Sequence, residues 1–266
     1  MDPELESITS DLMKFDWLLV AYIIVAALVV IMAVVCLVMK IIVWVKYRKA
    51  NKMPISSNLT GIKAAEFVLK KSGHSDIQVI KAGFFREMIF GNYYNIATKK
   101  IYLRSVFFKI DDKQSVTSTA IAVQKAAIAK MCEEGDKQAI TRNRLHLLGM
   151  FGPFLFIPLL LLTVLIDIFA FQTIGFLSIA GMLVSGAFLV MGFIVTFLNI
   201  PVEKRANEMA LKMMAEYGLA TGEELTVMKK VYDAYIISYI CDFILTILRI
   251  ILFILEILIK VRGSSK

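Results

Sequence analysis

Long apolar runs alternate with polar segments along the chain, and this alternation is the first guide to the fold. Four runs are each near the roughly 20 residues that a helix needs to cross the hydrocarbon core of a bilayer. The second run (147–169) and the third (174–198) are so close in sequence that they predict a tight helical hairpin. We therefore expect about four membrane-associated helices: a first transmembrane helix over 17–46, a transmembrane hairpin over 147–198 and a fourth apolar helix over 235–259.

Between the first and second runs the long apolar stretches give way to shorter segments, whose spacing of apolar residues is typical of mixed helices and strands. The stretch "SSNLTGIKAAEFVLKKSG" (56–73) has the apolar spacing of a capped helix that ends at a glycine. "DIQVIKAG" and "KKIYLRSVFF" alternate like short strands, and "FFREMIFGNYYNIAT" between them predicts an irregular loop or hairpin. The Ala-rich stretch "SVTSTAIAVQKAAIAKMCEEG" predicts another helix. The predicted fold class is an α-helical membrane protein with a small α+β layer over residues 53–146.

Composition agrees with a membrane protein and excludes several other classes. Hydrophobic residues make up 58% of the chain, and the mean hydropathy is +0.72. Three widely spaced cysteines and two histidines give neither a disulfide framework nor a histidine-rich catalytic site. The net charge of +8 fits a basic surface beside an anionic leaflet. No nucleic-acid-binding motif accompanies this charge, so we expect the lipid bilayer as a partner and no nucleic acid.

The distribution of charge around the runs predicts an orientation. Residues 1–16 are acidic, and basic residues follow the first run, which places the N-terminus outside the cytoplasm. Residues 53–146 and 199–234 are then cytoplasmic, and the protein is a multi-pass protein whose main soluble part is cytoplasmic. A fourth span would put the basic C-terminal residues outside the cytoplasm, whereas basic residues that flank membrane spans normally stay inside it. The orientation of 235–259 therefore stays open: this run could be tilted, interfacial or packed on the cytoplasmic part.

The fourth run carries a charged stripe. Asp242, Arg249 and Glu256 are spaced by seven residues, nearly two helical turns, so they share one face. Two interpretations remain: a polar path or partner-binding face, and a stripe turned toward protein, water or lipid headgroups. In the third run, "GMLVSG" at Gly181 and Gly186 predicts close packing of helices and not a pore.

Three stretches in order resemble one family, the YugP-like zinc metallopeptidases of bacterial membranes. The first is "SSNLTGIKAAEFVLKKSGHSDIQV". The second runs from "NYYNIATKKIYLRS" through "SVTSTAIAVQKAAIAKM", and the third is "NIPVEKRANEMALKMMAEYGL" followed by "VYDAYIISYICDFILTILRIIL". The resemblance covers about residues 17 to 259. It implies a gluzincin-like metallopeptidase core in the bacterial cell membrane and zinc as the family's cofactor.

The resemblance also locates the family's zinc site, and this chain departs from it. The family carries H-E-x-x-H on the helix that corresponds to 115–132: two histidines four residues apart hold zinc, and the glutamate activates a water molecule. Aligned on that helix, the two histidine positions are Gln124 and Ile128, and the glutamate position is Lys125. Glu203 in "PVEKRANE" matches the family's later carboxylate ligand. Upstream, Asn92–Ile96 replace an Asp-His-Tyr-Asp-Pro run.

These departures predict a protein that has kept the family fold and lost its metal. An isoleucine has no donor atom and a lysine repels a cation, so we expect no zinc, no catalytic residue and a pseudopeptidase with a scaffolding, regulatory or membrane-protein-binding role. An unpaired buried carboxylate is costly. We therefore predict that the Lys125 ammonium lies within salt-bridge or one-water distance of Glu203; the alternative is two solvated surface charges.

Two other functions stay open at this point. One is an active membrane zinc metallopeptidase whose site is rebuilt from other ligands. The other is a transporter or channel component, for which the charged residues in the apolar runs are the only indication.

Overall fold

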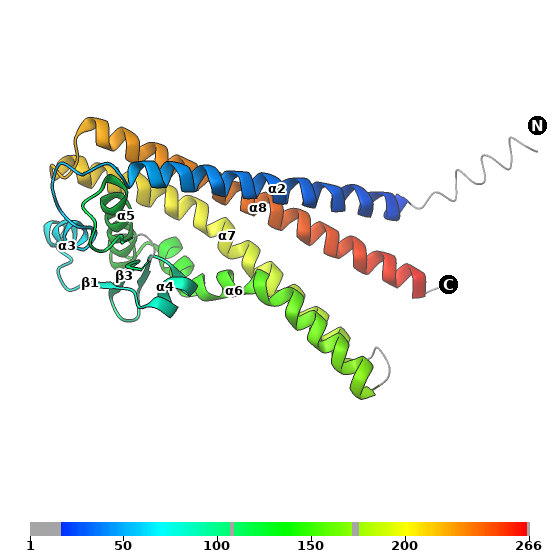
Figure 1. The fold of residues 1–266 in the computed structure, drawn as a ribbon. Helices are drawn as coiled ribbons and strands as arrows, with labels where there is room; N and C mark the ends of the chain where they lie inside the picture. Colours follow the sequence, from blue (N-terminus) through cyan, green and yellow to red (C-terminus); the bar gives the residue numbers. More distant parts are fainter. Residues whose placement is uncertain (1–16, 107–108, 172–175, 265–266) are drawn as a thin grey trace, which may run out of the picture.

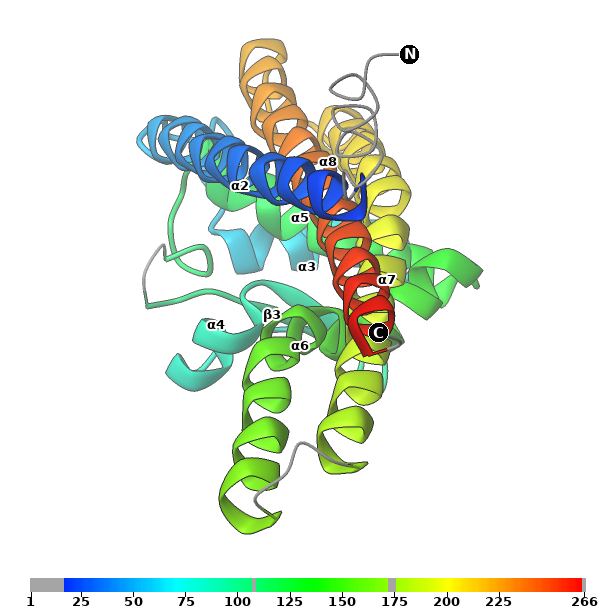
Figure 2. The ribbon, with the colours of Figure 1, turned by 90° about the vertical axis from the view of Figure 1, so that its right-hand side faces the viewer.

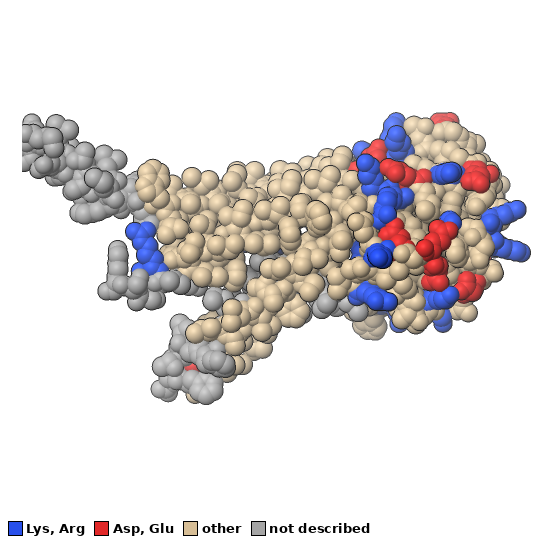
Figure 3. All heavy atoms as spheres, turned by 180° about the vertical axis from the view of Figure 1, so that it is seen from behind, with Lys and Arg blue, Asp and Glu red and all other residues tan. Residues whose placement is uncertain are grey.

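The computed structural model describes residues 17–106, 109–171 and 176–264, so the predicted extracytoplasmic segment 1–16 lies outside the described residues. The protein consists of a compact end, here called the head, and long helical segments that extend from it, here called the shaft (Figure 1). The head comprises residues 51–146 together with 199–234. The shaft comprises the remaining described residues. Charged side chains gather over the head, whereas the visible face of the shaft is almost free of charge (Figure 3).

The shaft is built from two pairs of antiparallel helices. The helix α2 (Trp17–Ala50) packs against α8 (Gly222–Ser264), and α6 (Lys137–Ile166) packs against α7 (Phe176–Glu216). A short π-helical turn, η1 (Asp167–Phe171), extends α6. The two pairs diverge with distance from the head (Figures 1 and 2). Because α8 runs back alongside α2, its C-terminal end lies at the same end of the shaft as Trp17.

Among the residues that the structure describes, two helices are long and apolar enough to cross a membrane by length and composition: α2, and α7 from Ile179 to Glu216. The predicted close packing at the two glycines is confirmed. Gly181 lies against the side chain of Thr163 on α6, and Gly186 faces the ring of Phe253 on α8. A larger side chain at Gly181 would overlap Thr163, so the third apolar run is closely packed against the second at this point.

The head contains the predicted mixture of helices and strands around a small three-stranded sheet. Its elements are α3 (Gly61–Lys71), β1 (Gln78–Lys81), α4 (Phe84–Phe90), β2 (Tyr93–Asn95), β3 (Lys100–Leu103) and α5 (Val116–Glu133). The strand order is β1-β3-β2: β1 is parallel to β3, and β2 is antiparallel to β3. Hydroxyl N-caps at Thr60 and Ser115 begin α3 and α5, as the sequence pattern indicates.

One prediction for the head needs correction. The segment "FFREMIFGNYYNIAT", predicted as an irregular loop or hairpin, begins with a helix, α4, which was not predicted. The hairpin alternative holds for its second part, because β2 is antiparallel to β3. The turn between α4 and β2 is made at Gly91, whose φ is +63°, and Tyr93 of β2 stacks on Tyr102 of β3 with ring centroids 4.9 Å apart. The aromatic residues of this segment therefore pair across strands, which a reading limited to local apolar periodicity does not detect.

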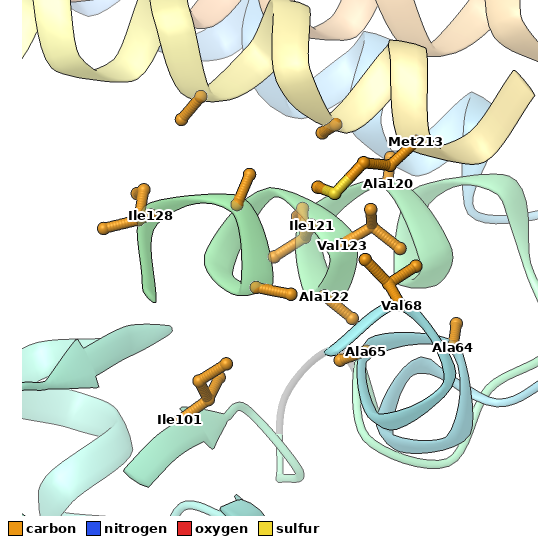
Figure 4. Close-up of a cluster of buried hydrophobic side chains, with 14 of the residues drawn as sticks. Ala64, Ala65, Val68, Ile101, Ala120, Ile121, Ala122, Val123, Ile128 and Met213 are labelled. Atoms are coloured by element: carbon orange, nitrogen blue, oxygen red, sulfur yellow. The ribbon is translucent and has the colours of Figure 1, made fainter. Parts of the chain in front are cut away.

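The Ala-rich helix α5 is the centre of the head. All of its residues from Val116 to Ala129 are buried. Helix α3 packs on one side and α7 on the other, with Val68 and Met213 among the side chains that meet it (Figure 4). A helix that is enclosed on every side needs small residues so that neighbouring backbones can approach. This explains why the faces of α5 differ little in hydrophobicity.

Candidate functional site

Helix α5 brings two polar side chains into this otherwise apolar interior. Gln124 and Lys125 lie in the middle of the helix and are each 8% exposed. They come from consecutive positions and face the polar part of α7. Because polar groups at this depth are costly unless they are satisfied, the facing residues must supply partners.

Helix α7 provides a matching polar row. Asn199, Glu203 and Asn207 are spaced by four residues, so they lie above one another on one face of the helix. Glu203 is 1% exposed and occupies the middle of the row. The row begins just before Pro201, where the apolar half of α7 gives way to its polar half.

Three donors from two other helices surround the Glu203 carboxylate. Arg142 Nη2 of α6 lies 2.7 Å from Glu203 Oε1, and Lys125 Nζ of α5 lies 3.4 Å from the same oxygen. The side-chain amide of Gln124 donates to the other oxygen, Oε2. Both carboxylate oxygens are therefore engaged by side chains of the protein.

The two asparagines hold these donors in place. Arg142 Nε donates to Asn199 Oδ1 over 2.5 Å, and Gln124 Nε2 donates to Asn207 Oδ1 over 2.9 Å. Arg142 and Gln124 thus each contact two members of the row on α7, whereas Lys125 contacts Glu203 alone. The arrangement links α5, α6 and α7 at one point, and we call it the Glu203 cluster: Gln124, Lys125, Arg142, Asn199, Glu203 and Asn207.

The electrostatics of the cluster favour an ionised glutamate. Burial acts to raise the pKa of the Glu203 carboxyl, but the charges of Lys125 and Arg142 outweigh it and hold that pKa below its ordinary value. Burial lowers the pKa of the Lys125 ammonium; the Glu203 charge opposes this shift and the Arg142 charge adds to it. Two cations therefore share one buried carboxylate, and Lys125 is the more distant of the two from it.

The predicted contact between Lys125 and Glu203 is present. The alternative of two solvated surface charges is wrong, because both side chains are buried. Ile128, the third residue that the resemblance places at the family's zinc site, lies elsewhere. It is fully buried within the main apolar core of the head (Figure 4). Gln124 and Ile128, which the resemblance aligns with the family's histidines, thus face different surroundings, one polar and one apolar.

Sequence reasoning missed Arg142. This residue lies 61 positions from Glu203 and resembles an ordinary basic flank of the second apolar run. The available signal was the four-residue spacing of Asn199, Glu203 and Asn207, which marks a polar face on a buried helix. This polar face requires hydrogen-bond donors, but the spacing does not indicate which helix supplies them.

The upstream run Asn92–Ile96 makes structural contacts. Asn92 Oδ1 accepts from the backbone N–H of Arg104, and Asn95 Oδ1 accepts from the backbone N–H groups of Ala97 and Thr98. The Tyr94 hydroxyl donates to Glu133 Oε1 at the end of α5 over 2.6 Å. These side chains fix the β2–β3 turn and the sheet against α5.

The donors at the Glu203 cluster do not fit a zinc ion. Zinc in proteins is held by three or four sulfur, nitrogen or carboxylate ligands. Here one carboxylate is available, its oxygens are occupied, and two ammonium or guanidinium groups beside it would repel a divalent cation. Within the described part of the chain, no three His, Cys, Asp or Glu side chains gather in a way that could hold a metal.

A cavity of about 700 Å³ adjoins the cluster. It lies where the head meets the shaft, and its walls come from α2, α5, α6, α7, α8 and the α4–β2 turn. Gln124, Lys125, Arg142 and Glu203 are among the residues that line it. Asp242 and Arg249 of the charged stripe on α8 also line it, and Asp242 pairs with Lys40 of α2 over 3.1 Å. Part of the stripe is therefore turned toward protein.

Comparison with known families confirms the resemblance. A family described as "putative neutral zinc metallopeptidase" matches residues 23–258, and the chain belongs to this family. Neither a curated protein nor a solved structure matches the chain. The matched region contains all the elements that form the Glu203 cluster.

Proposed function

We propose that this member of the zinc metallopeptidase family is a catalytically inactive membrane protein that works by binding and not by peptide hydrolysis. The observation that carries the proposal is the state of Glu203. Its carboxylate is neutralised by Arg142 and Lys125 and hydrogen-bonded by Gln124, so the charge that a zinc ion would balance is already balanced. The cluster serves as a structural joint between three helices.

The proposed membrane location rests on the surface of the shaft. Large apolar side chains are exposed along α2, along α7 and along the shaft part of α8, for example Ile31, Leu183 and Ile254. Apolar surface on this scale is unfavourable in water. We propose that all four shaft segments cross the cytoplasmic membrane of a bacterium, with the head in the cytoplasm.

The helix α4 adds a second apolar surface on the head. Phe85 is 74% exposed and Met88 is 61% exposed. The helix lies on the side of the head from which the shaft extends (Figure 1). This position supports contact with the membrane surface or with a membrane-protein partner, and a scaffolding or regulatory role is the form of activity that we propose.

Hydrolysis measurements test the inactive state directly. The full chain in detergent would be incubated with a fluorogenic casein substrate and zinc, beside the same sample with a chelator and beside Glu203→Gln. We expect no zinc-dependent hydrolysis in any sample. Hydrolysis that needs zinc and disappears in both controls would instead establish an active metallopeptidase with a rebuilt site. No observation on the described residues favours the transporter or channel function.

A further inference from the structure

The cavity between head and shaft has more positive than negative charge. Two carboxylates line it: Glu203 of α7 and Asp242 of α8. Glu203 is balanced by two cations of its cluster, and Asp242 is balanced by Lys40. Five basic side chains line the same cavity: Lys40, Arg104, Lys125, Arg142 and Arg249.

Arg249 is the informative member of this set. It lies two helical turns beyond Asp242 along α8, about 10 Å further into the shaft. The neighbouring residues of α8 are apolar, and Arg249 forms no ion pair with any other described residue. A cation at such a depth in an apolar helix is costly unless an anion or water meets it. The cavity that it lines provides the space for an anion.

The walls of the cavity combine this charge with apolar surface. Phe90, Ile121, Val195 and Leu245 line it together with the basic residues. The lining residues include members of α2, α6, α7 and α8. The α2/α8 pair and the α6/α7 pair diverge with distance from the head (Figure 1). A ligand that satisfies both features has an anionic end for the basic residues and apolar chains that continue between the diverging helices.

We propose that this cavity binds the phosphate headgroup of an anionic phospholipid, with Arg249 as the principal headgroup ligand, Lys40 shared between the headgroup and Asp242, and the acyl chains between the two helix pairs. The site lies beside the Glu203 cluster and does not depend on whether that cluster binds zinc. It rests on the proposed membrane location, since the lipid enters from the bilayer.

Native mass spectrometry of the full chain in a mild detergent tests the site. Phosphatidylglycerol would be titrated against the wild-type chain, with phosphatidylcholine as a zwitterionic comparison. We expect one phosphatidylglycerol per chain to be bound preferentially. The double variant Lys40→Gln/Arg249→Gln should weaken this binding by about ten-fold or more, because each basic residue near a lipid headgroup contributes a substantial part of the attraction.

A matched control removes the same charge from the same two helices. Lys46 on α2 and Arg262 on α8 do not line the cavity. The variant Lys46→Gln/Arg262→Gln should bind phosphatidylglycerol as the wild-type chain does. Equal weakening in both double variants would overturn the site, because it would show attraction to overall charge alone. Equal binding of phosphatidylcholine would overturn it as well.

Two soluble competitors distinguish a lipid from other anionic ligands. Glycerol 3-phosphate carries the phosphate without acyl chains, and hexaglutamate carries acidic groups on a peptide. We expect neither to displace phosphatidylglycerol at millimolar concentration. Displacement by glycerol 3-phosphate would reassign the cavity to a soluble phosphate compound. Displacement by hexaglutamate would reassign it to an acidic peptide. A failed lipid assay would leave the zinc measurements, and so the proposed inactive state, unaffected.

Discussion

The helices α5 and α2 are both mostly apolar and have no single polar face, yet one is enclosed by protein and the other is largely exposed. Helix α5 is rich in alanine, and its residues from Val116 to Ala129 are all buried. Helix α2 carries large aliphatic side chains, and only four of its residues are buried. The difference shows that side-chain size separates the two situations: small residues permit neighbouring helices to approach, whereas large ones cover a helix that the rest of the chain leaves exposed.

The two helices also differ in how a lysine side chain in each is paired. In α5, Lys125 is buried and its charge is met by Glu203. In α2, Lys40 is exposed at the edge of a cavity and pairs with Asp242, which is itself one-third exposed at its side chain. The buried Lys125 therefore requires the Glu203 carboxylate. The exposed pair of Lys40 and Asp242 adds only a little to the free energy of unfolding.

The largest effect is expected from removing the central charge of the buried cluster. Glu203→Gln leaves Lys125 and Arg142 as two buried cations that share no carboxylate. We expect a loss of about 3–5 kcal/mol in the free energy of unfolding, measured by chemical unfolding in detergent. Asp76→Asn removes a carboxylate from an exposed pair with Lys99 and should cost less than about 1 kcal/mol. Similar losses for the two variants would contradict the burial of the cluster's charges.

A smaller effect is expected from enlarging one alanine in each helix. Ala122 of α5 is fully buried, and Ala27 of α2 is exposed. Ala122→Leu should destabilise the protein by about 1–3 kcal/mol through overpacking, whereas Ala27→Leu should change stability by less than about 0.5 kcal/mol. Unfolding midpoints in the same detergent compare the two. If Ala27→Leu were the more damaging variant, α2 would be enclosed and the contrast between the helices would be wrong.

The start of α5 offers a third comparison. The Ser115 hydroxyl accepts from the backbone N–H of Ser118 and donates to Asn51 Oδ1. Ser115→Ala should cost about 1 kcal/mol by removing the N-cap. Thr60→Ala at the exposed cap of α3 serves as a matched control and should cost less, because its bond to Lys63 N is 3.4 Å long. The reverse order would show that the buried cap is not needed.

Acidification should produce the smallest effect over the accessible range. The folded pKa of Glu203 lies below its ordinary value of 4.5, so the unfolded chain takes up this proton first as the pH falls. The contribution of Glu203 to stability is therefore complete above about pH 4.5 and declines as the pH falls toward the folded pKa. Unfolding free energies measured from pH 7 to pH 3 should show this extra loss in wild type and not in Glu203→Gln. A parallel decline in both would contradict the assignment.

Much of the fold could be predicted from local patterns. Helices α3 and α5 have clear capping residues, and β1 and β3 alternate as strands do. The segment that forms α4 and β2 could not be predicted in the same way, because Tyr93 is fixed by stacking on Tyr102 of another strand. Four membrane spans were predicted, whereas length and composition support two spanning helices among the described residues. The other two spans stay a prediction.

The site was predictable only in part, for a similar reason. The contact of Lys125 with Glu203 followed from the cost of an unpaired buried carboxylate. Arg142, which lies closer to Glu203, is supplied by a helix distant in sequence, and only the packing of α6 against α7 brings it there. Local spacing identifies which residues need a partner, whereas the tertiary arrangement decides which residue provides it.

Zinc content is the most direct test of the central claim that protein cations and not a metal balance Glu203. The full chain would be purified in detergent without chelators and analysed by elemental mass spectrometry, beside Glu203→Ala. We predict no stoichiometric zinc in either sample. About one zinc per wild-type chain, lost in Glu203→Ala, would contradict the claim and show that other ligands have rebuilt the site.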